Sequence, residues 1–145
     1  MLKRLLGIAL LTTCAVAGSA QAAQKVTLGS ARFARDVPQF NGAGKVRPAL
    51  VGDGNTCEGQ ASELKWKRWG TKRASATGSM CNPCDVSCRA PSPAQAVAYD
   101  LGRCTPGGPR VYRRFKVRVR LPDGKWSKYS SLNTFGAGDK LCRSG

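Results

Sequence analysis

A run of alternating residues near the C-terminus constrains the fold more strongly than any other feature of this chain. Between Val111 and Leu121, the odd positions are apolar except for Arg113, and the even positions are cationic except for Tyr112. A period of two residues places successive side chains on opposite faces of a β-strand, and no helix reproduces it. We therefore predict a strand over residues 111–121, with its odd side chains buried and its even side chains exposed.

Four other segments show weaker strand signals, either alternation or a composition typical of strands. These segments are residues 63–69, 73–80, 94–101 and 126–132. The Pro-Asp-Gly-Lys sequence at 122–125 predicts a turn that pairs the last segment with 111–121 as a hairpin. No segment after residue 22 combines a helix cap with an apolar stripe. The predicted fold class is therefore all-β, a small antiparallel sandwich or open barrel.

The first 22 residues have the layout of a secretory signal peptide. Lys3 and Arg4 precede an apolar run over residues 5–18, and Ala20-Gln21-Ala22 then supplies a small-x-small cleavage site. The apolar run is too short to span a bilayer, so we expect no transmembrane span in the mature chain. We predict a signal peptide over 1–22, a partly mobile N-terminal arm over 23–55 and a β domain over 56–145. The predicted location is the periplasm or the extracellular space.

Six cysteines follow the predicted cleavage site. They are Cys57, Cys81, Cys84, Cys88, Cys104 and Cys142. An even number in a small exported chain predicts three disulfides, but the sequence alone does not select their pairing. The C-x-x-C spacing at Cys81 and Cys84 also occurs in zinc and redox sites. Because the chain has no histidine and is predicted to be exported, we favour structural disulfides and expect no metal and no cofactor.

The charge balance is strongly basic, with 24 Lys and Arg residues against 8 Asp and Glu. Two of the cations belong to the predicted signal, which leaves 22 against 8 and a formal charge of +14 on the mature chain. Such a surplus predicts attraction to polyanions. The absence of histidine excludes most Ser-His-Asp and Cys-His catalytic sites. The carboxylates form no recognisable catalytic motif, so we expect a protein that is not an enzyme.

Two basic groups are candidate anion-binding sites. The first is the even face of the predicted strand, a row about 20 Å long with Tyr112 at its end. It consists of Arg114, Lys116, Arg118 and Arg120. The second group consists of Lys65, Lys67, Arg68 and Lys72, with Trp66 and Trp69 between them. We assign the cations to phosphate or sulfate contacts and the three aromatic residues to stacking.

Both groups also have a plainer interpretation. The row is equally consistent with the solvated face of a half-buried sheet, or with an edge protected by charge against aggregation. The two tryptophans are alternatively core residues. Because Trp66 and Trp69 differ in parity, a flat strand buries only one of them, and burying both requires a bulge.

One segment of the chain carries a family resemblance. A W-x-x-W pattern at residues 66–69 leads through Ala74 and Gly78 to Cys81-Asn82-Pro83-Cys84. This arrangement resembles a group of small exported bacterial β-proteins that share a W-x-x-W segment followed by a C-N-P loop. The resemblance implies export and a compact β fold, and it implies no particular activity. The third cysteine of the loop, Cys88, departs from the pattern.

Three classes of function agree with these features. The first is a non-catalytic module that binds anionic polymers, namely cell-envelope polysaccharide, an anionic lipid surface or nucleic acid. The second is a secreted factor that binds a protein partner, as an inhibitor or an effector. The third is a hydrolase that acts on an anionic substrate such as nucleic acid, using carboxylates that are distant in sequence. The strongly basic strand favours the first class.

Overall fold

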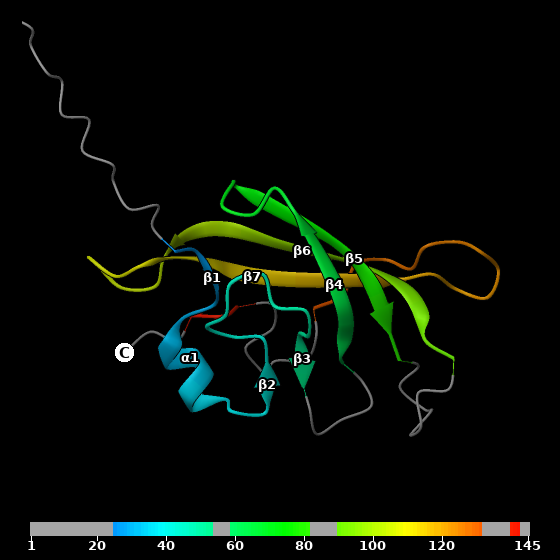
Figure 1. The fold of residues 1–145 in the computed structure, drawn as a ribbon, viewed down its shortest axis with the longest axis horizontal. Helices are drawn as coiled ribbons and strands as arrows, with labels where there is room; N and C mark the ends of the chain where they lie inside the picture. The colour runs from blue at the N-terminus through cyan, green and yellow to red at the C-terminus, as the bar shows by residue number, and fades with distance from the viewer. Residues whose placement is uncertain (1–24, 54–58, 82–89, 132–139, 143–145) are drawn as a thin grey trace, which may run out of the picture.

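The structure is a computed structural model that describes residues 25–53, 59–81, 90–131 and 140–142. It is built mainly from strands, which confirms the predicted all-β class (Figure 1). The strands are β1 (Thr27–Leu28), β2 (Phe40–Asn41), β3 (Gly52–Asp53), β4 (Ala61–Lys67), β5 (Arg73–Met80), β6 (Ser92–Arg103) and β7 (Arg110–Val119). A single short helix, α1 (Ala31–Asp36), completes the elements of the described residues.

Five strands form one curled sheet, half of a barrel, in the order β1-β7-β6-β5-β4. Neighbours from β4 to β7 are antiparallel, whereas β1 pairs with β7 in parallel, so the sheet is mixed. β2 and β3 form a second, two-stranded sheet. Figure 1 shows α1, β2 and β3 together on one side of the curled sheet. That side is the inner face, and the opposite side is called the outer face below.

The predicted hairpin after β7 is present as isolated bridges rather than as a continuous strand. Arg120 pairs with Trp126, and Val117 pairs with Ser130. The turn between them closes when the Gly124 N–H donates to the Leu121 carbonyl over 2.9 Å. The segment 126–130 therefore lies along the edge of β7.

The core lies between the inner face of the sheet and residues 25–53. The inner faces of β5 and β6 consist largely of buried alanines, and these small side chains leave room for bulky partners. The alanines are Ala74, Ala76, Ala94, Ala96 and Ala98. Large buried side chains from the N-terminal region, among them Leu28, Phe33 and Phe40, belong to the same core cluster.

The helix α1 was not indicated by the sequence pattern. Its N-cap is Ser30, whose hydroxyl accepts a hydrogen bond from the Phe33 N–H over 3.0 Å. Phe33 is the only buried residue of the helix, so six residues show no apolar stripe that a periodicity argument detects. Among the described residues, no helix is long and apolar enough to cross a membrane.

The predicted alternation along β7 is only partly correct, because Arg114, Lys116 and Arg118 are half-buried rather than exposed. Phe115 and Val117 are buried, but Tyr112 is also buried, with 0% of its surface exposed. At the other end, Leu121 is 42% exposed instead of buried. The predicted exposure of Tyr112 and burial of Leu121 are therefore wrong.

A change of face in two paired strands explains the burial of Tyr112. Tyr112 and Phe115 both belong to the core although they are three positions apart. Opposite them, Asp100 of β6 has a left-handed backbone with φ of 59°. The pairs Tyr99–Arg114 and Leu101–Tyr112 keep one register across this point. Both strands therefore turn the opposite face inward at the same place, which local alternation in one strand does not reveal.

A disulfide joins Cys104, just after β6, to Cys142 near the C-terminus, with their Cα atoms 5.4 Å apart. Cys81 is disulfide-bonded as well. The remaining predicted disulfide cysteines, Cys57, Cys84 and Cys88, lie outside the described residues. Next to Cys142, Leu141 is completely buried in the core, so this bond holds a segment that contributes to packing.

Candidate functional site

Strand register brings Lys65 and Lys67 of one predicted basic group onto the same face of the sheet as Lys116 and Arg118 of the other. On the outer face, one cross-strand row runs Lys65–Thr77–Gln95–Arg118, and the next runs Lys67–Ser75–Val97–Lys116. Each row thus ends in a cation on β4 and a cation on β7. Three strand spacings separate these ends, a distance of about 14 Å between backbones.

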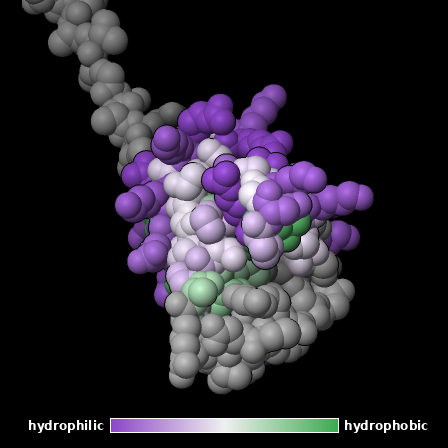
Figure 2. Space-filling view, turned by 90° about the vertical axis from the view of Figure 1, so that its right-hand side faces the viewer, coloured by the Kyte–Doolittle hydropathy of each residue, from purple (hydrophilic) through white to green (hydrophobic). Residues whose placement is uncertain are grey.

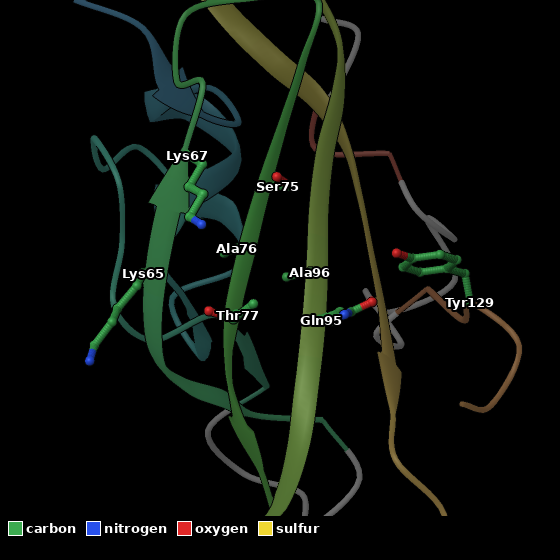
Figure 3. A pocket seen from close by; sticks show the side chains of 8 residues that line it. All are labelled: Lys65, Lys67, Ser75, Ala76, Thr77, Gln95, Ala96 and Tyr129. Atoms are coloured by element: carbon green, nitrogen blue, oxygen red, sulfur yellow. The ribbon is translucent and has the colours of Figure 1, made fainter. Parts of the chain in front are cut away.

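A shallow groove of about 230 Å³ lies on this face. Figure 3 shows Lys65 and Lys67 on one side of it and Tyr129 on the other, with Ser75, Thr77 and Gln95 between them. Ala76 and Ala96 also line the groove, although both are buried in the core. The floor is therefore uncharged and carries hydroxyl and amide groups beside the alanines, and the walls are cationic and aromatic.

The two lysines of β4 are exposed and available to a ligand. Among the described residues, neither Lys65 nor Lys67 makes a hydrogen bond, an ion pair or a contact with an aromatic ring. They follow one another on the same face of a strand, so their backbones are about 6.8 Å apart. An anionic group that approaches both ammonium groups therefore displaces only the water molecules that hydrate them.

The two central cations of β7 have aromatic partners instead. The Lys116 Nζ lies 5.2 Å from the ring centre of Tyr99 and 4.8 Å from that of Tyr129. The Arg118 guanidinium lies 4.8 Å from the ring centre of Tyr129 and 5.1 Å from that of Trp126. Such cation–π contacts hold the side chains in place while leaving their charge intact. Part of the predicted row is thus a packed layer of cations and rings.

Arg118 also fixes the side chain of Gln95. Its Nε and Nη2 both donate to the Gln95 Oε1, over 2.9 and 2.6 Å. Because the oxygen accepts both bonds, the Gln95 NH₂ group is the part of the amide left for other partners. In Figure 3, the amide oxygen points away from the two lysines, toward β7.

The ends of the predicted row have other partners. The Arg114 Nε lies 3.6 Å from one carboxylate oxygen of Asp100, and the Arg113 Nη2 lies 2.6 Å from the other. One carboxylate therefore pairs with two guanidinium groups. At the far end, the Arg120 Nε donates to the Gly124 carbonyl in the turn over 3.1 Å. Of the four predicted cations, Lys116 and Arg118 lie in the rows that cross the groove.

The structure places both predicted stacking tryptophans against the core. Their indole N–H groups donate to backbone carbonyls, Trp66 to Pro48 over 2.7 Å and Trp69 to Val26 over 3.0 Å. β4 ends at Lys67, and Arg68 has a left-handed backbone with φ of 54°, so Trp69 returns to the inner side. This irregularity lets both rings, which are half-buried, pack against the core despite their difference in parity.

The β4–β5 turn contains the remaining predicted residues. Arg68 and Lys72 are exposed there. The third predicted stacking residue, Tyr112, lies beneath the turn, with its ring centre 4.9 Å from that of Trp69. Its hydroxyl accepts a hydrogen bond from the Gly70 N–H and donates one to the Thr71 carbonyl, both over 2.8 Å. Burial raises the pKa of Tyr112 above its ordinary value, and the bond from Gly70 opposes that rise.

Sequence reasoning missed several residues that line the groove or contact its neighbouring cations. They are Ser75, Thr77, Gln95, Tyr99, Trp126 and Tyr129. The predicted hairpin gave one usable signal, because a segment paired with β7 brings its aromatic side chains close to the basic row.

Figure 2 shows hydrophilic side chains along the top and sides of the described surface at one end of the molecule, with surface of intermediate hydropathy between them.

Within the described residues, no group of three or more His, Cys, Asp or Glu side chains is placed to hold a metal ion. The outer face offers ammonium groups, hydroxyls and an amide, a set of groups suited to binding anions and hydroxyl-bearing ligands. Searches against family models, curated proteins and solved structures return no match to this chain.

Proposed function

We propose that the mature chain is an exported basic domain that binds anionic polymers, without catalysis, at the cell envelope or outside the cell. The observation that carries this proposal is the pairing of Lys65 and Lys67 with Lys116 and Arg118 across a polar floor on the outer face. The proposal of export rests on the signal-like residues 1–22, which lie outside the described residues.

A polymer suits this face better than a small anion does. The cations stand at both ends of two neighbouring cross-strand rows, so a ligand that meets all four has negative charges spread over more than 10 Å. The high net charge of the chain, +16 including the signal, adds long-range attraction to any polyanion. Binding of this kind releases counterions and weakens steeply with salt.

The test is a salt-titrated binding panel on the mature protein. The ligands are duplex DNA, lipopolysaccharide, anionic phospholipid vesicles and a polyuronate. The test variant is Lys65→Gln/Lys67→Gln. The matched control is Lys25→Gln/Lys45→Gln, which changes the net charge equally. Lys25 and Lys45 are exposed in the N-terminal region, which packs on the inner face.

We expect the Lys65→Gln/Lys67→Gln variant to lose affinity for the polymer that binds, while the control variant changes far less. If that polymer is duplex DNA, the slope of log affinity against log salt falls by about two, one for each phosphate contact removed. Equal losses in the two variants would show that net charge, rather than the outer face, determines binding. Binding that is unchanged in both variants would refute the assignment of the site.

A further inference from the structure

We propose that the polymer is an acidic polysaccharide, one of whose sugar units occupies the groove with its acidic group between Lys65 and Lys67. This inference rests on the proposed function and names its ligand class. Nucleic acid is the competing class.

The floor presents groups that match sugar hydroxyls. Among the described residues, the hydroxyls of Ser75 and Thr77 have no hydrogen-bond partner. Each hydroxyl both donates and accepts, as a sugar hydroxyl does. Beside them, the NH₂ group of Gln95 supplies donors, and its orientation is fixed because Arg118 holds the amide oxygen. Arg118 is thus a positioning residue, which acts by orienting the Gln95 amide.

The aromatic residues argue against single-stranded nucleic acid. Proteins that bind single-stranded nucleic acid stack its bases on open aromatic faces. In the described part of the outer face, Tyr99, Trp126 and Tyr129 each pack against Lys116 or Arg118. A base that stacked on one of them would have to share or displace an existing contact. The rings of Trp66, Trp69 and Tyr112 are packed in or against the core.

The size of the groove agrees with a single sugar unit. Its volume of about 230 Å³ is below the roughly 300–1,000 Å³ of pockets that enclose a drug-sized ligand. The two lysines on one side of the groove are exposed, so a chain can enter and leave along the surface there. One unit then makes the specific contacts, and its neighbours add charge attraction.

The experiment compares three polymers at equal concentrations of charged groups and equal salt. Polygalacturonate carries carboxylates on sugar rings, polyacrylate carries carboxylates without sugars, and single-stranded DNA carries phosphates and bases. We expect the mature protein to bind polygalacturonate about tenfold more tightly than either of the others. Equal affinity for polygalacturonate and polyacrylate would overturn the inference, because charge alone would then explain binding.

Two variants test the contacts on the floor. Thr77→Val keeps the β-branched shape and removes the hydroxyl, and Thr105→Val, in an exposed loop, is its matched control. We expect Thr77→Val to weaken polygalacturonate binding by about threefold to tenfold, the effect of one hydrogen bond, and to leave polyacrylate binding unchanged. Arg118→Lys keeps the charge but not the two hydrogen bonds to Gln95. It should likewise weaken polygalacturonate binding and leave polyacrylate binding unchanged.

The failure of this inference is distinguishable from the failure of the proposed function. If the protein binds DNA more tightly than polygalacturonate, and the Lys65→Gln/Lys67→Gln variant loses that binding, the polysaccharide assignment is refuted. The proposal that the outer face binds anions then stands. Equal loss of polyacrylate and polygalacturonate binding in Thr77→Val would refute the contact to sugar hydroxyls. Thermal melting of every variant checks that the fold is intact, so that each loss is read as a loss of contact.

Discussion

The hydroxyl of Tyr112 ties the β4–β5 turn to β7, and the substitution Tyr112→Phe removes that tie without leaving a large cavity. The hydroxyl makes two hydrogen bonds of 2.8 Å, with the Gly70 N–H and the Thr71 carbonyl. A typical intramolecular hydrogen bond contributes about 0.5–1.5 kcal/mol net. Because Gly70 and Thr71 are exposed, water partly replaces the lost partner. We therefore expect the free energy of unfolding to fall by about 1–2 kcal/mol at neutral pH.

The same residue gives this prediction a pH dependence. Burial raises the pKa of Tyr112 in the native state above its unfolded value of about 10. Below that pH, the group is neutral in both states and its contribution to stability is fully present. Above it, the unfolded chain loses its proton first, so stability falls by up to about 1.4 kcal/mol per pH unit until the native pKa is passed. Phenylalanine has no proton to lose, so the gap between wild type and variant should narrow as the pH rises above about 10.

The assay is urea denaturation followed by tryptophan fluorescence, at neutral pH and through the alkaline range. Trp69 contacts Tyr112, so its emission reports on this part of the fold. Tyr129→Phe is the matched control, because its hydroxyl makes no hydrogen bond with a described residue. The control should change the free energy of unfolding by less than about 0.5 kcal/mol at neutral pH. A Tyr112→Phe effect no larger than the control, or a gap that stays constant at alkaline pH, would refute the reasoning.

Two further predictions concern the covalent framework and the backbone. Cys104→Ser/Cys142→Ser opens a loop with a sequence separation of 38, so urea denaturation should show a loss of about 4 kcal/mol; a loss below about 1 kcal/mol would contradict the loop-entropy argument. Gly52 has φ of 132°, and an added Cβ would lie 1.4 Å from the Gly59 carbonyl oxygen. Gly52→Ala should therefore unfold the protein or lower its melting temperature far more than Gly107→Ala, whose Cβ meets no neighbour; similar melting temperatures would count against this clash.

Local sequence patterns are enough to indicate the class of the fold and the position of its clearest strand. Residues 111–121 alternate over a length that only a strand accommodates, and β7 (Arg110–Val119) lies there. The turn at 122–125 closes as its proline, aspartate and glycine indicate. These features follow from local chemistry, namely backbone geometry and the spacing of apolar side chains, so no knowledge of distant contacts is needed.

Which face of a strand packs against the core is harder to predict from the sequence. In β6, Val97 and Tyr99 are the bulkier side chains, yet Ala96 and Ala98 face the core. Val97 is itself buried, on the outer face, so the bulk of the side chains does not identify the face that packs against the N-terminal region. The alanines face inward because the aromatic and aliphatic side chains of the N-terminal region, such as Phe33, occupy the space above them. The sequence of β6 contains no information about that partner.

The candidate site depends most completely on tertiary structure. Lys65 and Arg118 are 53 positions apart in the sequence, and they share a row only because β4, β5, β6 and β7 pair in one fixed register. The same pairing places Thr77 and Gln95 between them. The residue types indicate two basic groups. The distance between these groups, the floor that joins them and the rings that contact Lys116 and Arg118 all result from non-local strand pairing.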